Sequence, residues 1–511
     1  MLLLLVAVLS TAPSDPVDGD LFVFEADIRE VGSEPWMAGV SVVFTSADYF
    51  IGITRDHRAE DLGIASLIGS GPVDLDAYRL IHLMPGRDRP SGLPGEPVLE
   101  RGTILLVRLE EPAADPVLIE GTRFVQPLRV RIAREADLPA PLQGPADGYI
   151  EDIVASVSEA NLAANIQHLQ DYETRLCISP EYDMATAWAD DWLSDHWIPT
   201  EQQPFFFYGD SMNNVIGEIQ GQLDPDRIYI ICGHLDSIVW PMAPAPGADD
   251  NGSGSAAVLE AARVLGPYNF NYTIRFVLFG AEEVGLVGSE VYASQAYGAG
   301  EDIQGVVNLD MILYAPPGRD TLWIPYDDNS QALAEYAGTV MQQYVPALGT
   351  EIVYDPSATY SDHASFWEFG YPAILGIEHD VDFNPYYHQS TDLLENYLSY
   401  FPFGTNCTRA AIAVIASLAE PIGPSGAGGG GQQPVSLRVW PNPCTDVLTV
   451  ELASPAGASV SLFDLSGREV LASGMTPGQS LELDLSGLPG GMYTIVCSTA
   501  SSSFSSRFVR L

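Results

Sequence analysis

In this sequence, several histidine and acidic residues lie directly after runs of apolar residues. Five of them could bind metal, and they lie at the ends of such runs or in the loops beyond: His234, Asp250, Glu283, Asp310 and His388. Imidazole nitrogens and carboxylate oxygens are common ligands of zinc. Two imidazoles and three carboxylates suffice for a pair of ions, so we predict a cofactor of two zinc ions.

Two further acids stand beside these candidate ligands. In an extended segment, residues two apart project to the same side, so Asp236 can accept the ring proton of His234 and fix the tautomer that binds zinc. Glu282 and Glu283 leave the apolar run 275–279 and point to different sides, so Glu283 can bind metal while Glu282 acts as general base. Alone, the first pair is more typical of a core histidine paired with an acid, and the second pair is common on surface turns.

Asp249 and Asp250 precede a turn rich in glycine and serine at 251–254. A carboxylate placed there can bridge two metals, and the small residues let the backbone approach the ions closely. Helix capping is the competing explanation for acids at this position.

The order of the elements explains how these side chains could meet. From residue 228 onward, buried strands alternate with helices at 253–265 and 289–295, and helical spacing also covers 150–172 and 185–196. We therefore predict an α/β fold with a mixed, mostly parallel sheet sandwiched by helices, in which ligands bind at the carboxyl ends of the strands.

Composition shifts divide the chain into five predicted segments. We expect a signal peptide at 1–12, a β-rich accessory domain or prodomain at 21–137, the α/β domain at 148–420, a glycine-rich linker at 421–434 and an all-β sandwich at 435–511. Five cysteines are too few for a disulfide scaffold. Unpaired buried thiols and the bridges Cys177–Cys407 and Cys444–Cys497 are the alternatives.

The charge balance excludes several classes of partner. The chain has 22 basic and 68 acidic residues, a net charge of −46 and no lysine. Such a surface repels nucleic acid and anionic lipid, and no apolar run is long enough for stable membrane insertion. The acidity favours solubility or adaptation to salt.

Five motifs together resemble those of secreted di-zinc aminopeptidases, the family that includes the bacterial leucyl aminopeptidases. They are His-Leu-Asp-Ser at 234–237, Gly-Ala-Asp-Asp-Asn-Gly-Ser-Gly at 247–254, Gly-Ala-Glu-Glu-Val-Gly-Leu-Val-Gly-Ser at 280–289, Asn-Leu-Asp-Met at 308–311 and Tyr-His-Gln-Ser-Thr-Asp at 387–392. The similarity covers roughly residues 150–418 and implies the zinc exopeptidase fold.

The resemblance also implies a role for each site residue. One zinc takes His234 and Asp310, the second takes Glu283 and His388, and Asp250 bridges them. Glu282 is implied as the general base that activates a metal-bound water, and Tyr387 as a group that holds the developing oxyanion. The implied substrates are peptides with a free N-terminus.

The last segment resembles the C-terminal sorting domain of type IX secretion substrates, through Val-Trp-Pro-Asn-Pro at 439–443, Val-Ser-Leu-Phe-Asp-Leu-Ser-Gly-Arg at 460–468 and Gly-Gly-Met-Tyr at 490–493. The type IX secretion machinery is then a partner, and the protein is expected to be secreted or attached to the cell surface. An adhesion or carbohydrate-binding module is the alternative for this segment. For the whole chain, the alternatives are a glutaminyl cyclase-type acyl transferase and a metal-free, peptidase-like binding protein.

Overall fold

The computed structural model describes the chain from residue 145 to 424, apart from 208, 240–242 and 380–383. It also describes residues 20–24, 40–45, 49–54, 65–69, 77–83, 95–101, 104–109, 122–127, 138, 437–440, 445, 447–452, 458–464, 468–475, 480–489, 491–498 and 503–510. The chain divides into two compact units, Met1–Ile422 and Gly423–Leu511. The predicted signal peptide lies outside the described residues.

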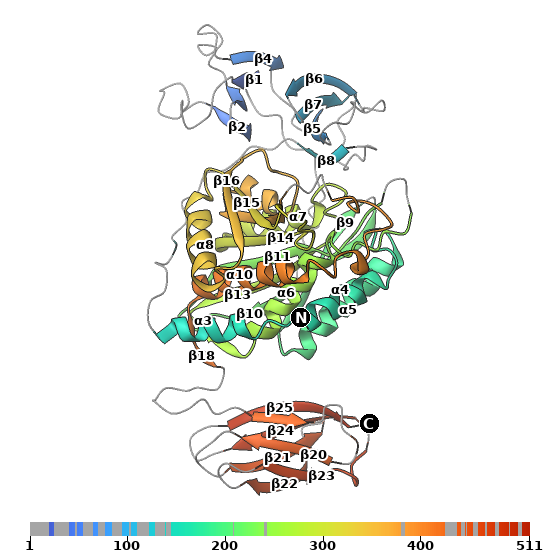
Figure 1. The fold of residues 1–511 in the computed structure, drawn as a ribbon, viewed down its shortest axis with the longest axis vertical. Helices are drawn as coiled ribbons and strands as arrows, with labels where there is room; N and C mark the ends of the chain where they lie inside the picture. Colours follow the sequence, from blue (N-terminus) through green and yellow to red (C-terminus); the bar gives the residue numbers. More distant parts are fainter. Residues whose placement is uncertain are drawn as a thin grey trace, which may run out of the picture. The chain divides into compact units, whose positions relative to one another are not determined.

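The centre of the first unit is an eight-stranded sheet of order β16-β15-β17-β14-β11-β13-β10-β9 (Figure 1). Its strands are β9 Thr200–Phe207, β10 Asp210–Ile219, β11 Asp224–His234, β13 Tyr272–Phe279, β14 Asp302–Asp310, β15 Thr321–Tyr326, β16 Gly349–Tyr354 and β17 Ala373–Glu378. The run β13-β11-β14-β17 is parallel, whereas β9, β10 and β13 pair antiparallel. This is the mixed, mostly parallel sheet that the sequence predicts.

Helices cover both faces of this sheet, as Figure 1 shows. They are α3 Pro145–Ala155, α4 Glu159–Gln170, α5 Pro180–Asp195, α6 Gly252–Leu265, α7 Val287–Ala299, α8 Gln331–Tyr344, α9 His363–Glu368 and α10 Phe401–Ala419, with a short 3₁₀ turn at Leu394–Asn396. A two-stranded sheet pairs β12 Tyr268–Phe270 with β18 Pro421–Pro424, which begins at the end of this unit.

Alternating side chains of the central strands serve two separate cores. On β11, Tyr229 and Ile231 pack with α4, α6, α8 and α10, whereas Ile230 and Cys232 pack with α7 and α9. A strand buried on both faces must be apolar at every position, which explains the unbroken run in the sequence. The polar side chains at the carboxyl ends of these strands are therefore where a binding site can form.

The other described strands form all-β regions. In the predicted accessory segment, one sheet contains β1 Asp20–Phe24, β2 Ser41–Thr45, β3 Phe50–Thr54 and β4 Ala65–Gly69, and another contains β5 Tyr78–Leu83, β6 Gly95–Arg101, β7 Ile104–Leu109 and β8 Thr122–Pro127. Both contribute to one apolar core, in which Leu21 and Ile51 pack with Leu80 and Leu106. The boundaries and role of this segment stay predictions.

The second unit is a sandwich of two antiparallel sheets. One contains β19 Leu437–Trp440, β20 Val447–Leu452 and β23 Ser480–Asp484, and the other contains β21 Ala458–Asp464, β22 Glu469–Met475, β24 Gly491–Ser498 and β25 Ser503–Arg510. Leu448 and Leu483 of the first sheet pack against Val460 and Ile495 of the second. The predicted all-β fold is confirmed.

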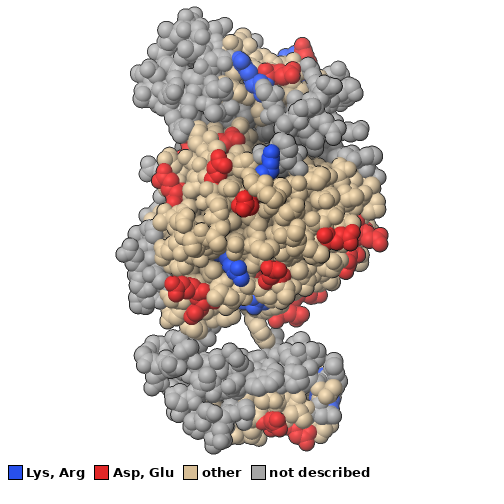
Figure 2. Space-filling model, viewed as in Figure 1, with Lys and Arg blue, Asp and Glu red and all other residues tan. Residues whose placement is uncertain are grey.

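Two expectations about the whole chain can be compared with the described residues. Four cysteines, Cys177, Cys232, Cys407 and Cys497, are buried and unbridged, so the predictions of a Cys177–Cys407 and a Cys444–Cys497 bridge were both wrong. Of the helices that the structure describes, none combines the length and hydropathy of a bilayer-spanning segment. On the face drawn in Figure 2, acidic side chains are spread over the described surface and basic ones stand singly among them.

Candidate metal centre

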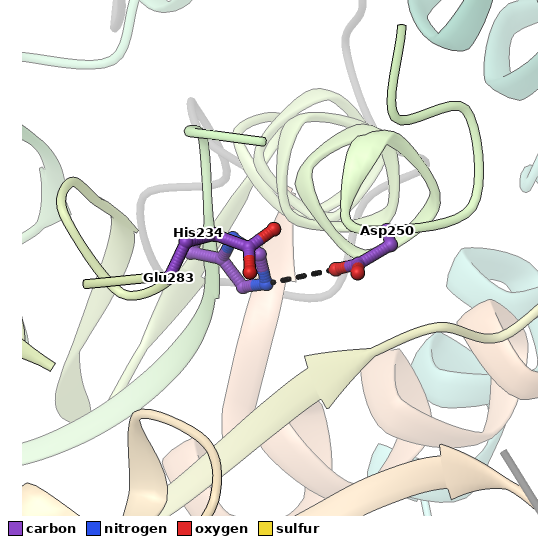
Figure 3. A group of neighbouring side chains, drawn as sticks. All are labelled: His234, Asp250 and Glu283. Carbon is purple, nitrogen blue, oxygen red and sulfur yellow. Dashed lines mark ion pairs between the residues drawn. The ribbon is translucent and has the colours of Figure 1, made fainter. Parts of the chain in front are cut away.

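Three neighbouring parallel strands bring the predicted ligands to one edge of the sheet. His234 is the last residue of β11 and Asp310 the last of β14, while Glu282 and Glu283 follow the end of β13. Asp250 comes from the loop that leads into α6, and His388 from the loop after β17. Figure 3 shows His234, Asp250 and Glu283 converging from three separate segments.

Each of the two imidazoles faces several carboxylates, and one of these, Asp250, is shared between them. The Nε2 atom of His234 lies 3.4 Å from Asp250 Oδ1, 3.4 Å from Asp310 Oδ1 and 3.8 Å from Glu282 Oε2. The Nε2 atom of His388 lies 2.9 Å from Glu283 Oε2 and 3.2 Å from Asp250 Oδ2. Asp250 therefore turns one carboxylate oxygen toward each histidine.

Several of these buried oxygens have no hydrogen-bond partner. They are Asp250 Oδ2, Glu283 Oε1 and Asp310 Oδ1. Leaving a buried acceptor unpaired costs about 1–3 kcal/mol, and more when the group is charged. Two groups of three donors, His234 with Asp250 and Glu283 and His234 with Glu282 and Asp310, have ligand atoms within 4.8 Å of one another. Imidazole and carboxylate donors at this spacing fit zinc.

The pKa values of the cluster reflect its burial and its mutual charges. Burial raises the pKa of Glu283 to about 7 and raises that of Glu282 well above its ordinary range. Although burial acts in the opposite direction, the carboxylates of Glu282 and Asp310 raise the pKa of His234. Without a cation, this site therefore favours bound protons, whereas a divalent ion can replace them.

Asp236 contacts both His234 and the turn that carries Glu282 and Glu283. The Nδ1 atom of His234 is 3.1 Å from the main-chain carbonyl oxygen of Asp236 and 3.5 Å from its carboxylate oxygen Oδ1. That carboxylate accepts the backbone N–H groups of Glu282 at 3.2 Å and Glu283 at 3.3 Å. The nearer acceptor for the imidazole is thus the carbonyl, and the carboxylate fixes the turn that carries the two glutamates.

Tyr387 lies beside the cluster, next to His388 in the chain. Its ring stacks on the His388 imidazole with centroids 4.0 Å apart, and it packs against the apolar group of Met311, Leu375 and Ile377. These contacts hold the imidazole in place. The predicted role of the Tyr387 hydroxyl at an oxyanion stays a prediction.

Sequence reasoning gave no role to two buried polar residues near the cluster. Arg175 donates hydrogen bonds to four backbone carbonyls, and Asp392 accepts the backbone N–H groups of Asp249 and Asp250. Asp392 lies in the same motif as His388, and its place in that motif could have indicated a role at the site. Arg175 lies in a loop before α5, where no motif marks it.

Comparison with protein families decides the class of this chain. Residues 214–405 match the model of peptidase family M28, and residues 438–510 match that of a secretion system C-terminal sorting domain. The chain carries an M28 peptidase domain. The predicted enzyme class of peptidase and the predicted secreted or surface location are confirmed, and the M28 match contains all five predicted ligands.

Relatives of this peptidase match about half of the chain. A probable leucine aminopeptidase of Trichophyton verrucosum is 28% identical over 52% of this chain and 74% of its own length. A probable zinc metalloprotease of Pyrenophora teres f. teres is 26% identical over 54% of this chain and 70% of its own. The solved structure of the Legionella pneumophila LapA aminopeptidase, 19% identical, shares the fold with a TM-score of 0.54 over 67% of this chain and 98% of its own.

Proposed function

We propose that this peptidase is a zinc aminopeptidase that removes N-terminal residues from peptides and holds two zinc ions. One ion is assigned to His234 and Asp310, the other to Glu283 and His388, with Asp250 between them. The observation that carries the proposal is the split of the Asp250 carboxylate, whose Oδ1 faces His234 and whose Oδ2 faces His388. The aminopeptidase and zinc metalloprotease names of the relatives support it.

The bound ions would supply an acidified water nucleophile and polarise the scissile carbonyl. Glu282 is the base in this proposal, because its buried carboxylate lies farther from His234 Nε2, at 3.8 Å, than those of Asp250 and Asp310, each at 3.4 Å. Burial raises the pKa of the Glu282 carboxyl in the metal-free site, and a carboxylate within reach of a metal-bound water can take its proton and return it. An oxygen of Glu282 accepts the proton from water and passes it to the amine nitrogen that leaves.

The acidic surface of the chain also favours substrates with a free amine. Two zinc ions would balance the charge of the four carboxylates in the cluster, so the negative potential that remains comes from the net charge of −46. An N-terminal ammonium group is attracted to such a surface, whereas an acylated terminus is not. This favours removal of residues from the chain end over cleavage within a peptide.

The sorting domain supports a second part of the proposal, that the type IX secretion machinery recognises residues 435–511 and exports the peptidase. The predicted linker at 421–434 then separates the exported enzyme from its sorting tail. Deletion of residues 435–511 is expected to retain the peptidase inside the cell envelope while leaving the enzyme folded. Fractionation of cells that express the full and the shortened chain tests this.

A panel of aminoacyl chromogenic substrates with N-acetylated controls tests the activity. We expect zinc-dependent hydrolysis of free-amine substrates and none of their acetylated forms. Hydrolysis that survives acetylation contradicts the aminopeptidase proposal. Conversion of N-terminal glutamine to a cyclised product, without hydrolysis, favours the glutaminyl cyclase alternative, and inertness in both assays with no bound zinc favours the binding protein.

A further inference from the structure

The segment that carries Asp250 is held from one side by Arg175. The Nη1 atom of Arg175 donates to the carbonyl of Pro246 at 2.6 Å, and Nη2 donates to that of Gly247 at 2.8 Å. Its Nε atom donates to the carbonyl of Leu235 at 2.7 Å, directly after His234. One guanidinium therefore joins the end of β11 to the loop before α6.

Asp392 holds the same segment from the other side. Its main-chain carbonyl accepts the N–H of Ala248 at 3.1 Å, and its carboxylate oxygens accept those of Asp249 and Asp250, each at 3.0 Å. The hydroxyl of Tyr397 donates to the same carboxylate at 2.8 Å. The five consecutive residues 246–250 are thus each hydrogen-bonded to Arg175 or to Asp392.

Arg175 and Asp392 together form a clamp on residues 246–250, and Gly247 shows how closely this clamp fits. Its φ of +53° lies in the left-handed region that glycine adopts without strain. A Cβ atom added at Gly247 would lie 2.6 Å from the Cβ of Ser237 and 2.9 Å from the Nη2 of Arg175. The sequence thus keeps a glycine where the guanidinium and the loop meet.

The clamp also places a fixed positive charge under the cluster. The Arg175 side chain is fully buried and has Asp392, Asp236, Asp250 and Glu283 as its electrostatic neighbours. Burial lowers the pKa of Arg175 to about 10, so the guanidinium remains charged at neutral pH. Its ring of carbonyl acceptors makes the burial of this charge tolerable.

We propose that Arg175 and Asp392 are positioning residues that orient Asp250 so that its two oxygens reach both metal positions. This inference rests on the proposed two-zinc function. Contacts behind a metal ligand fix its orientation, and their loss typically weakens metal binding about 10–100-fold. Arg175 precedes the region matched by the M28 model, so the proposal extends the metal centre beyond residues 214–405.

The test compares Co²⁺ binding by the metal-free full-length protein with that of Arg175→Lys and Asp392→Asn. Lysine keeps the charge but cannot reproduce the planar fork of donors, and asparagine turns an amide N–H₂ toward a backbone N–H. We expect Co²⁺ affinity, measured against a competing chelator, to fall about 10–100-fold in each variant. The visible absorption of bound Co²⁺, which reports ligand geometry, is expected to change as well.

Matched controls come from a second arginine and acid pair, in which Glu260 is buried and the Arg263 side chain is 27% exposed. Arg263 donates to Glu260 at 2.6 Å and Glu260 accepts the N–H of Ser158, far along α6 from the cluster. Arg263→Lys and Glu260→Gln are expected to lower thermal stability while leaving Co²⁺ affinity and absorption unchanged. These controls therefore show whether a loss of stability by itself changes Co²⁺ binding.

The outcomes separate this inference from the proposed function. A wild-type protein that binds no Co²⁺ contradicts the proposed function itself. A wild-type protein that binds two ions, together with variants of unchanged affinity and absorption, overturns the positioning role of Arg175 and Asp392. Circular dichroism of each metal-free variant verifies folding. Asp392→Asn preserves volume and one acceptor oxygen, so its result decides the matter if Arg175→Lys does not fold.

Discussion

Two groups of charges in the peptidase domain, one partly exposed and one buried, differ in how they are neutralised. In the first, Arg275 of β13 donates to Glu218 at 2.8 Å and to Glu301 at 2.6 Å, and it also bonds the hydroxyl of Tyr292. In the second, Asp250, Glu283 and Asp310 surround His234 and His388 and keep buried oxygens without hydrogen bonds. The first group contains its own cation, whereas the second has more carboxylates than the nearby Arg175 can neutralise.

This difference teaches how to recognise a binding site among charged clusters. Burying a carboxylate is expensive unless a positive charge and hydrogen bonds compensate for it. The Arg275 group satisfies that requirement within the protein, so it needs no further partner. The cluster of His234 and His388 satisfies it only when positive charge is bound, which is why it can serve as a metal centre.

The largest expected effect comes from removing the proposed base. Glu282→Gln should retain metal but lower turnover by about 10²–10⁴-fold, because the amide cannot take the proton from water. Steady-state kinetics and zinc content of the same preparation provide the measurement. Glu218→Gln in the Arg275 group is the matched control and should leave turnover unchanged. Equal loss of zinc and turnover in Glu282→Gln would overturn the role of Glu282.

Removing metal should destabilise the peptidase domain. At free zinc about 100-fold above the dissociation constant, binding contributes about 2.7 kcal/mol to the folded state. Chelation should therefore lower Tm by roughly 5–10 °C, as measured by calorimetry with and without added zinc. An unchanged Tm would mean that the two groups of charges are alike and that neither depends on a bound ion.

Breaking the Arg275 group should affect stability alone. Arg275→Met leaves two partly exposed carboxylates without their cation, and because solvent screens Glu218 and Glu301, the expected cost is at most about 1 kcal/mol in the free energy of unfolding. Zinc affinity and turnover should stay at the wild-type values, because the contacts of Arg275 do not include the metal ligands. A loss of zinc in this variant would show that the two groups are coupled through β13.

The smallest effect is a pH dependence of the metal-free protein. Against the effect of burial, Glu283 and Asp250 raise the pKa of His388 to about 10, from near 6.5 in the unfolded chain. Its contribution to stability is full below pH 6.5 and is lost as the pH rises toward 10. Burial raises the pKa of Asp392 to about 8, which acts in the same direction.

The Tm of the metal-free protein should therefore fall between pH 7 and 9. Zinc takes the place of the proton on His388, so the zinc-loaded protein should show a smaller slope over the same range. Thermal unfolding in both forms measures the difference. A metal-free protein that gains stability as the pH rises would contradict these pKa directions.

Much of the fold and the ligand cluster could be predicted from the sequence, because strands buried on both faces are apolar until they end. His234 and Asp310 are each the last residue of such a strand. Parallel neighbours must place those ends together, so the pattern of apolar runs also predicts which side chains meet.

The supporting contacts could not be predicted in the same way. Arg175 bonds backbone carbonyls up to 72 residues away, and Asp392 bonds N–H groups 142 and 143 residues away. Backbone groups carry no sequence signal, so only the folded chain shows these partners. The expectation for Asp236 relied on the alternation of an extended strand, but β11 ends at His234 and the carboxylate turns toward the N–H groups of Glu282 and Glu283.

The zinc content of the reconstituted full-length protein tests the central claim most directly. Elemental analysis after removal of excess metal should give two zinc ions per chain, and His388→Ala should give one, because only the group with Glu283 is lost. One ion in the wild-type protein, or none, would contradict the assignment of Asp250 as the carboxylate shared by two ions.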